Sequence, residues 1–312
     1  MWIMNNLNYS FAVGYVRALE AKLLPDACFL KLKQSVSLDQ FKNVLKSFNY
    51  NFINFTTFTE FSLKLNSSFC GVVDYLIKIC PTKKPFEILF FKNDCHNLKV
   101  ILLANLLHFN FSNLILKPRF LPVHLLENCV VSKSFESMPV YYKNLALGLI
   151  ELCDEGIEKF EIENFYNKMM FKTKLQMSSN LSYVFLKNRT RIEIDLFNLN
   201  LVLKVLNLNL GEDVLKNSLV EGGFLNSYFI IKSFNAGVDS LCDFLNLELG
   251  IDFSKLLKSP NLFFEFAVER LMNFESSQAN LPFSFAAIAS YLTNLNREHE
   301  LLKKFLIQIV KI

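Results

Sequence analysis

Residues that could hold a metal or act as a nucleophile are few and scattered along this chain of 312 residues. The four histidines are His96, His108, His124 and His299. Their spacing matches no metal-binding motif, and Cys95 and His96 are adjacent, so their side chains point apart on a helix. The sequence also contains no Gly-rich phosphate loop, no Gly-x-Ser-x-Gly elbow and no His-Glu-x-x-His motif. It therefore predicts no catalytic residue, no metal site and no cofactor.

The seven cysteines form neither a Cys-x-x-Cys pair nor a close cluster. An odd number of cysteines at scattered positions argues against a disulfide framework and is typical of a reducing compartment. A free cysteine is more often a small buried apolar residue than a metal ligand, which is our interpretation of Cys95.

A short polar pattern occurs three times at a nearly constant interval. The three copies are Asp94-Cys95-His96-Asn97-Leu98-Lys99, Asp195-Leu196-Phe197-Asn198-Leu199 and, more weakly, Arg297-Glu298-His299-Glu300-Leu301. We refer to the polar and ring residues of the copies as the signature residues. They are Asp94, His96, Asn97 and Lys99 in the first copy, Asp195 and Asn198 in the second, and Arg297, His299 and Glu300 in the third.

The interval between the copies predicts how the chain is divided. Asn198 lies 101 residues after Asn97 (198 − 97), and Glu300 lies 102 residues after Asn198 (300 − 198). Such a period indicates one helical unit of about a hundred residues that is used three times. The predicted repeat units are 1–115, 116–218 and 219–312.

The signature residues have two interpretations. In the first, each satisfies backbone groups where helices meet, and the pattern repeats because the architecture repeats. In the second, the polar groups converge around a pseudo-threefold axis and line a cavity that binds a partner. Buried polar residues usually serve the hydrogen bonds of their own fold, which favours the first interpretation.

Charged residues indicate two possible docking positions. Glu151, Asp154, Glu155 and Glu158 have the spacing of one helical face, which is either solvated or a docking surface for a basic partner. Arg17 lies near the end of another predicted helix. The net charge of +4 is too small and too dispersed for a nucleic-acid interface.

Composition predicts a helical protein with a large core. Hydrophobic residues make up 52% of the chain, which includes 33 phenylalanines but only 9 glycines and 8 prolines. No apolar run approaches the roughly 18 residues of a membrane span. The N-terminal residues lack the features of a secretory signal, so we expect a cytosolic protein.

Apolar periodicity places the individual helices. Helices are predicted at 9–24, after the cap Ser37–Gln40, at 58–80 (one helix or two), 86–109, 140–152, 158–176, 178–188, 191–209, 224–234, 238–248, 254–257, 260–274, 283–294 and 297–311. The stretch 118–139 reads as an irregular crossover, Pro282 as a helix break, and the pair Gly222-Gly223 as a tight turn.

Four segments together resemble a known family. They are Tyr15–Leu24, Phe90–Lys99 with its aromatic, Asp and Asn-Leu-Lys, Glu221-Gly222-Gly223-Phe224-Leu225, and Pro282–Ile309. In this order and spacing they resemble the C subunit of the A/V-type (vacuolar-type) rotary ATPases, the relative of the d subunit of the eukaryotic V-ATPase. The resemblance covers essentially the whole chain, although 118–139 and 150–165 match little and Cys95 replaces a bulkier residue.

The resemblance implies an all-α, funnel-like body of three similar helical units around a pseudo-threefold axis, with no catalytic site of its own. It implies a central-stalk subunit that couples the rotating shaft to the membrane rotor ring and transmits torque between ATP hydrolysis or synthesis and proton or sodium transport. The implied partners are the central-shaft subunits of the soluble head and the proteolipid ring. Nucleic acid, a small-molecule substrate and a transmembrane span of its own are not expected. The implied location is peripheral, on the cytoplasmic face of the membrane.

Two other classes remain open. A helical scaffold or adaptor unrelated to rotary ATPases would also be all-α, although common helical repeats have shorter periods of roughly 33–47 residues. An enzyme would need a converging set of acid, base or nucleophile, and the sequence shows none.

Overall fold

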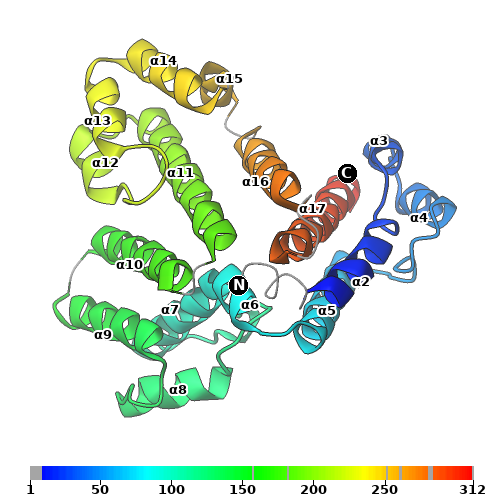
Figure 1. Ribbon diagram of the computed structural model, residues 1–312, viewed down its shortest axis with the longest axis horizontal. Helices are drawn as coiled ribbons and strands as arrows, with labels where there is room; N and C mark the ends of the chain where they lie inside the picture. The colour runs from blue at the N-terminus through cyan, green and yellow to red at the C-terminus, as the bar shows by residue number, and fades with distance from the viewer. Residues whose placement is uncertain are drawn as a thin grey trace. The chain divides into compact units, whose positions relative to one another are not determined.

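The computed structural model describes residues 9–156, 158–180, 183–250, 252–259, 262–279 and 284–310. Within these ranges the secondary structure is helical and contains no strand, which confirms the all-α class (Figure 1). The chain forms two compact units: unit 1 comprises Met1–Lys83 and Met272–Ile312, and unit 2 comprises Lys84–Leu271. The boundary near residue 271 falls inside helix α16 (Phe263–Ala279). The division into three sequence repeats stays a prediction.

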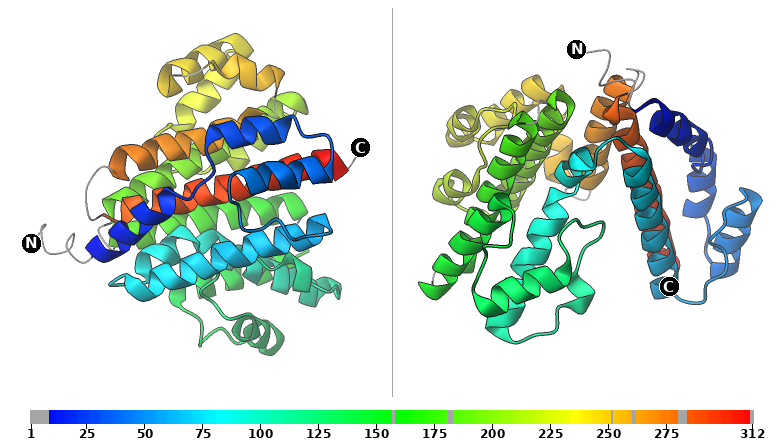
Figure 2. Two further views of the ribbon diagram at one scale, coloured as in Figure 1. Left: turned by 90° about the vertical axis from the view of Figure 1, so that its right-hand side faces the viewer. Right: turned by 60° about the horizontal axis from the view of Figure 1, so that its bottom comes forward.

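Unit 1 is built around its C-terminal helix. Its described helices are α2 (Ser10–Glu20), α3 (Asp26–Lys33), α4 (Leu38–Ser47), α5 (Phe58–Ile79) and α17 (Phe285–Val310). α17 contacts α2, α3, α4 and α5, and Figure 2 shows α5 and α17 side by side. Phe41, Phe55 and Phe61 form an aromatic cluster in the same core as Leu302 and Leu306 of α17. Burying such side chains is the main source of stability for this unit.

Unit 2 contains the first two signature helices. Its elements are α6 (Lys84–Leu89), α7 (Phe91–Leu107), the 3-10 turn η1 (Ser112–Leu114), α8 (Val123–Ser132), α9 (Val140–Asp154), α10 (Lys159–Asn180), α11 (Val184–Asn207), α12 (Glu212–Ser218), α13 (Ser227–Asn235), α14 (Val238–Leu249), α15 (Phe253–Lys258) and the first part of α16. α10 packs against both α9 and α11, and α7 packs against α8 and α9. α9 and α10 approach closely at Gly148, where any side chain would collide with the Phe165 ring.

The start of α4 follows the predicted capping chemistry. Ser37 caps α4, because its hydroxyl accepts from Gln40 N at 3.2 Å while the Gln40 side chain accepts from Val36 N at 3.0 Å. A similar reciprocal arrangement, absent from the sequence predictions, starts α5 at Thr57 and Glu60. The Ser37 cap is therefore confirmed.

Several predicted element boundaries were wrong. The predicted helices 283–294 and 297–311 are one helix, α17, and the predicted crossover 118–139 contains α8. α10 continues to Asn180, so the predicted helix 178–188 does not exist as a separate element. Helix 86–109 is divided into α6 and α7, and α3 and α12 were not predicted. The expected break at Pro282 lies outside the described residues.

Candidate functional site

Asn97, at the middle of α7, holds a loop through both ends of its side-chain amide. Its Nδ2 donates to the Leu116 carbonyl at 3.0 Å, and its Oδ1 accepts from Leu116 N at 2.7 Å. Asn97 is fully buried. Because an amide presents a donor and an acceptor side by side, it satisfies both backbone groups of one loop residue.

Asn198 makes the same pair of hydrogen bonds on α11. Its Nδ2 donates to the Val220 carbonyl at 2.8 Å, and its Oδ1 accepts from Val220 N at 2.9 Å. Asn198 is also fully buried. The two asparagines therefore perform one structural task in two places.

Asp94 lies one helical turn before Asn97 and binds the continuation of the same loop. Its Oδ1 accepts from Phe120 N at 3.0 Å and Leu121 N at 3.1 Å, and its Oδ2 accepts from the Tyr142 hydroxyl at 3.2 Å. Burial raises the pKa of Asp94 to about 6, although these hydrogen bonds oppose the rise. We call Asp94, Asn97 and the loop 116–121 the first clamp.

Asp195 repeats this arrangement one turn before Asn198. Its Oδ2 accepts from Phe224 N at 3.1 Å and its Oδ1 from Leu225 N at 2.9 Å. Burial raises its pKa to about 6 as well. Asp195, Asn198 and the loop 220–225 form the second clamp, in which the helix residues are shifted by 101 positions and the loop residues by 104 relative to the first clamp.

The paired glycines are required by this second clamp. Any side chain at Gly223 would occupy the position of the Asp195 carboxylate, so only glycine lets the loop backbone come this close. Gly222 has φ +101°, a conformation that is strained for other residues. The Gly222-Gly223 pair therefore has two roles: it forms the turn, and it lets the loop backbone come close to Asp195.

Glu298, in unit 1, is a third buried carboxylate that binds a loop in the same way. Its Oε2 accepts from Leu24 N at 2.7 Å, and the Tyr50 hydroxyl hydrogen-bonds to the same carboxyl group. Burial raises the pKa of Glu298. We call Glu298, Leu24 and Tyr50 the third clamp.

Glu298 was not among the predicted signature residues. The signal that could have revealed it is the loop: Leu24-Pro25, Leu121-Pro122 and Leu225-Asn226 each stand directly before a helix, and each leucine N–H binds a buried carboxylate.

The other signature residues are placed differently from one another. His96 is half-buried, with Nε2 3.1 Å from the Leu114 carbonyl, and Lys99 pairs with Glu163 at 2.7 Å and lies over the Tyr166 ring. His299 is buried against Phe69, and burial, with Lys303 nearby, lowers its pKa to about 4, so the ring is neutral at pH 7. The last two signature residues are not part of a clamp. Glu300 pairs with Lys303, and Arg297 is half-buried.

The predicted docking residues fall in two settings. Arg17 pairs with Glu20 at 2.7 Å and donates to the Ala279 carbonyl at 2.9 Å, so it holds two parts of unit 1 together. The four acidic residues lie at the chain surface, but α9 ends at Asp154, so they surround the turn between α9 and α10 instead of sharing one helical face. The members of this acidic turn are Glu151, Asp154, Glu155 and Glu158.

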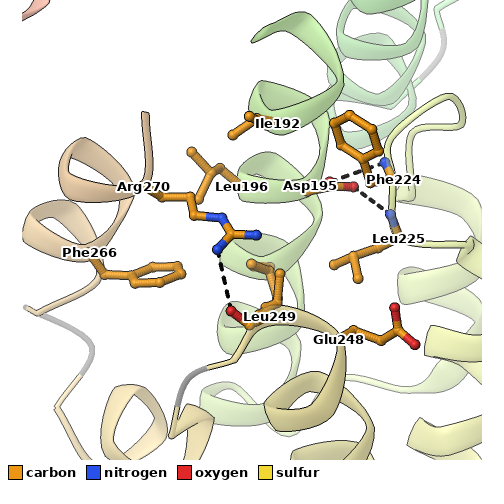
Figure 3. Close-up of a pocket in the computed structure, with 10 residues that line it drawn as sticks. Ile192, Asp195, Leu196, Phe224, Leu225, Glu248, Leu249, Phe266 and Arg270 are labelled. Atoms are coloured by element: carbon orange, nitrogen blue, oxygen red, sulfur yellow. Dashed lines mark hydrogen bonds between the residues drawn. The ribbon is translucent and has the colours of Figure 1, made fainter. Parts of the chain in front are cut away.

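A cavity of about 260 Å³ lies beside Asp195 within unit 2 (Figure 3). Its walls come from α11, α14, α16 and the loop before α13, and include Ile192, Asp195, Leu196, Leu199, Phe224, Leu225, Glu248, Leu249, Phe266 and Arg270. The Arg270 guanidinium donates to the Leu249 carbonyl at 3.3 Å. The lining is therefore mixed: most of its residues are apolar, and Asp195, Glu248 and Arg270 supply charged groups.

The described residues contain no group of three or more histidine, cysteine or acidic side chains that could hold a metal ion. Within the same ranges, no helix combines the length and apolar character needed to cross a bilayer. The buried polar groups of the clamps serve backbone groups of the chain itself. These features define the class: an α-helical protein in which repeated buried side chains hold its own loops.

Comparison with known proteins identifies the family. The family described as ATP synthase (C/AC39) subunit matches residues 12–303, and the chain belongs to it. The C subunit of the A-type ATP synthase of Desulfurococcus sp. (strain SY) is 24% identical over a 322-position alignment that covers 95% of this chain and 84% of the relative. The corresponding C subunit of Pyrococcus horikoshii is 26% identical over 236 positions, covering 70% of this chain and 62% of the relative.

Proposed function

We propose that this chain is a non-catalytic central-stalk subunit of an A/V-type ATPase that couples the rotating shaft to the membrane rotor ring. In this role it transmits torque between ATP hydrolysis or synthesis in the soluble head and proton or sodium transport in the membrane. Membership of the ATP synthase (C/AC39) subunit family and the two relatives named as C subunits of A-type ATP synthases support the proposal. The partners are then the central-shaft subunits and the proteolipid ring, and the location is the cytoplasmic face of the membrane.

The structural observation that carries this proposal is the repeated clamp. A subunit that transmits torque must resist deformation, and hydrogen bonds from buried side chains to loop backbone groups hold those loops in place. Three long helices, α7, α11 and α17, each present a buried carboxylate that binds the loop in front of a shorter helix. The clamps therefore suit a protein that bears load.

Within this proposal, we assign the signature residues of the first two clamps to internal support and the acidic turn to docking. Asp154 and Glu155 lie at the C-terminal end of α9, where the helix dipole disfavours negative charge. Like charges also repel one another across the turn. Residues that lower local stability in this way are suited to a basic surface on a partner subunit.

The first experiment is affinity purification of this chain from its native membranes, followed by mass spectrometry. The proposal expects head, shaft and ring subunits to copurify. If the chain emerged alone or with unrelated soluble proteins, a helical scaffold would be the better assignment, and ATP hydrolysis by the isolated chain would instead indicate an enzyme.

The docking assignment has its own test. Charge reversal of Glu155→Lys with Glu158→Lys should reduce assembly of the complex by about tenfold, while the Tm of the isolated chain stays the same or rises. Glu136→Lys with Asp243→Lys is the matched control, because both residues are exposed acids of unit 2 outside the acidic turn. Unchanged assembly of the Glu155 and Glu158 variant would remove the acidic turn from the interface.

A further inference from the structure

The carboxylates of the three clamps differ in one respect. Asp94 accepts a hydrogen bond from the hydroxyl of Tyr142, and Glu298 accepts one from the hydroxyl of Tyr50. Within the part of the chain that the structure describes, Asp195 accepts from the two backbone N–H groups of Phe224 and Leu225 and from no hydroxyl. A carboxylate has about four acceptor positions, so Asp195 retains unused capacity.

A cavity of about 260 Å³ lies beside Asp195 (Figure 3). Asp195 lines it and is itself 6% exposed. Leu196 and Leu225 form apolar walls, and Phe266 offers an aromatic ring on the opposite side. The first and third clamps thus contain a phenol ring beside the carboxylate, and the second contains an open space.

Size and charge restrict what could occupy this space. An apolar cavity of about 150 Å³ is enough to hold a benzene ring, so a single substituted ring fits here. Asp195 and Glu248 disfavour an anionic ligand, and Arg270 on the facing helix disfavours a cationic one. A neutral donor such as a hydroxyl suits the carboxylate without adding a charge.

We infer that this cavity is a binding site for a single aromatic ring that carries a hydroxyl group, which donates to Asp195. The ring packs against Leu196, Leu225 and Phe266 and supplies the hydrogen bond that tyrosines supply to the other two carboxylates. The source is either a free phenolic molecule or a tyrosine of a partner protein. This site does not depend on the proposed coupling function.

The direct test compares p-cresol with p-xylene, which has nearly the same shape and lacks the hydroxyl. Saturation-transfer NMR on the full chain gives both affinities. Binding of p-cresol should be about tenfold tighter or more, since only p-cresol donates a hydrogen bond to the carboxylate. Absence of p-cresol binding, or equal affinity for the two compounds, would overturn the inference.

Variants locate the binding at this cavity. Leu196→Phe should fill the space and weaken p-cresol binding at least tenfold, whereas Leu247→Phe, on the 82% exposed Leu247 of the neighbouring α14, should leave it unchanged. Phe266→Trp fills the cavity from the opposite wall and replaces Leu196→Phe if that variant fails to fold. Unaltered binding in a folded cavity-filling variant would show that p-cresol binds elsewhere.

The assembled complex distinguishes the two sources. If a partner tyrosine occupies the cavity, the purified complex no longer binds p-cresol, although the isolated chain does. If the complex and the isolated chain bind p-cresol alike, the natural ligand is a free molecule. Both results support the site, and they assign it to different ligands.

Discussion

The first and second clamps have the same hydrogen bonds on different loops. In the first, Pro118 and Arg119 precede the bound residues, and the Lys117–Pro118 peptide bond is cis. In the second, Gly222 and Gly223 occupy the corresponding positions, 104 residues further on. The buried aspartate and asparagine thus define the arrangement, and the loop can reach it by two different backbone routes.

The two clamps also differ in what lies beside the aspartate carboxylate. Tyr142 from α9 closes the first clamp, whereas the second opens on a cavity. The first carboxylate is therefore held by three donors and the second by two. The first clamp is complete within the chain, and the second has capacity for another group.

The largest expected effect comes from Gly223→Ala. The new methyl group would displace the Asp195 carboxylate and disrupt both of its backbone hydrogen bonds, at a cost of about 3–6 kcal/mol in the free energy of unfolding. Arg119→Ala, at the corresponding position of the first clamp, should change it by less than about 1 kcal/mol. Urea titration of both variants measures the difference, and similar losses would show that the two loops do not differ as described.

The asparagines should respond alike. Asn97→Ala and Asn198→Ala each leave the backbone N–H and the carbonyl of one loop residue without their side-chain partner, so each should lower the free energy of unfolding by about 2–4 kcal/mol. Ser132→Ala, on an exposed helix end, serves as the control. A loss at one asparagine that is several-fold larger than at the other would contradict their equivalence.

The repeat in the sequence predicted the helix residues of the first two clamps. In both clamps the aspartate precedes the asparagine by three positions, and both residues recur 101 positions later. Asn97 and Asn198 carry the same side chain at the same point of their helices, so the spacing alone aligned them. Their common role was one of two interpretations that the sequence left open.

The repeat in the sequence did not predict the third clamp, and the reason is physical. Glu298 binds Leu24, so the carboxylate and its loop are 274 residues apart, whereas Asp94 and Asp195 bind loops that follow within about 30 residues. Tyr142 and Tyr50 were missed because they reach the carboxylates from elements that only tertiary packing brings near. The prediction of two helices in place of α17 was wrong because the polar stretch near residue 296 resembles a helix end. In the structure Leu295 and Glu298 are buried, and the helix continues through this stretch.

The pH dependence of stability should be similar in the two clamps. The pKa of Asp195 rises from 3.8 to about 6 on folding, so between these values the folded chain binds more protons than the unfolded chain. Stability contributed by this carboxyl group is therefore greatest below about pH 4 and is lost as the pH rises through about 6, by up to roughly 3 kcal/mol.

The measurement is the difference in unfolding free energy between the wild-type chain and Asp195→Asn from pH 4 to pH 7, with Asp94→Asn examined in parallel. The wild-type chain should lose stability relative to each variant over this window, since asparagine does not titrate. A difference that stays constant, or that increases in favour of the wild type, would show that the carboxyl groups ionise with ordinary or lowered pKa values.

The smallest effect is expected for the hydroxyl that distinguishes the clamps. Tyr142→Phe removes one donor to Asp94 and leaves the ring in place, so the free energy of unfolding should fall by about 1–2 kcal/mol at pH 7. The loss should shrink below about pH 5, because protonated Asp94 depends less on the donor, and the pKa of Asp94 should rise further. Tyr228→Phe, on the 65% exposed Tyr228 of α13, is the control. If Tyr142→Phe were neutral at pH 7, the hydroxyl would not contribute to the first clamp, and the open space beside Asp195 would lose its significance as the position of a missing donor.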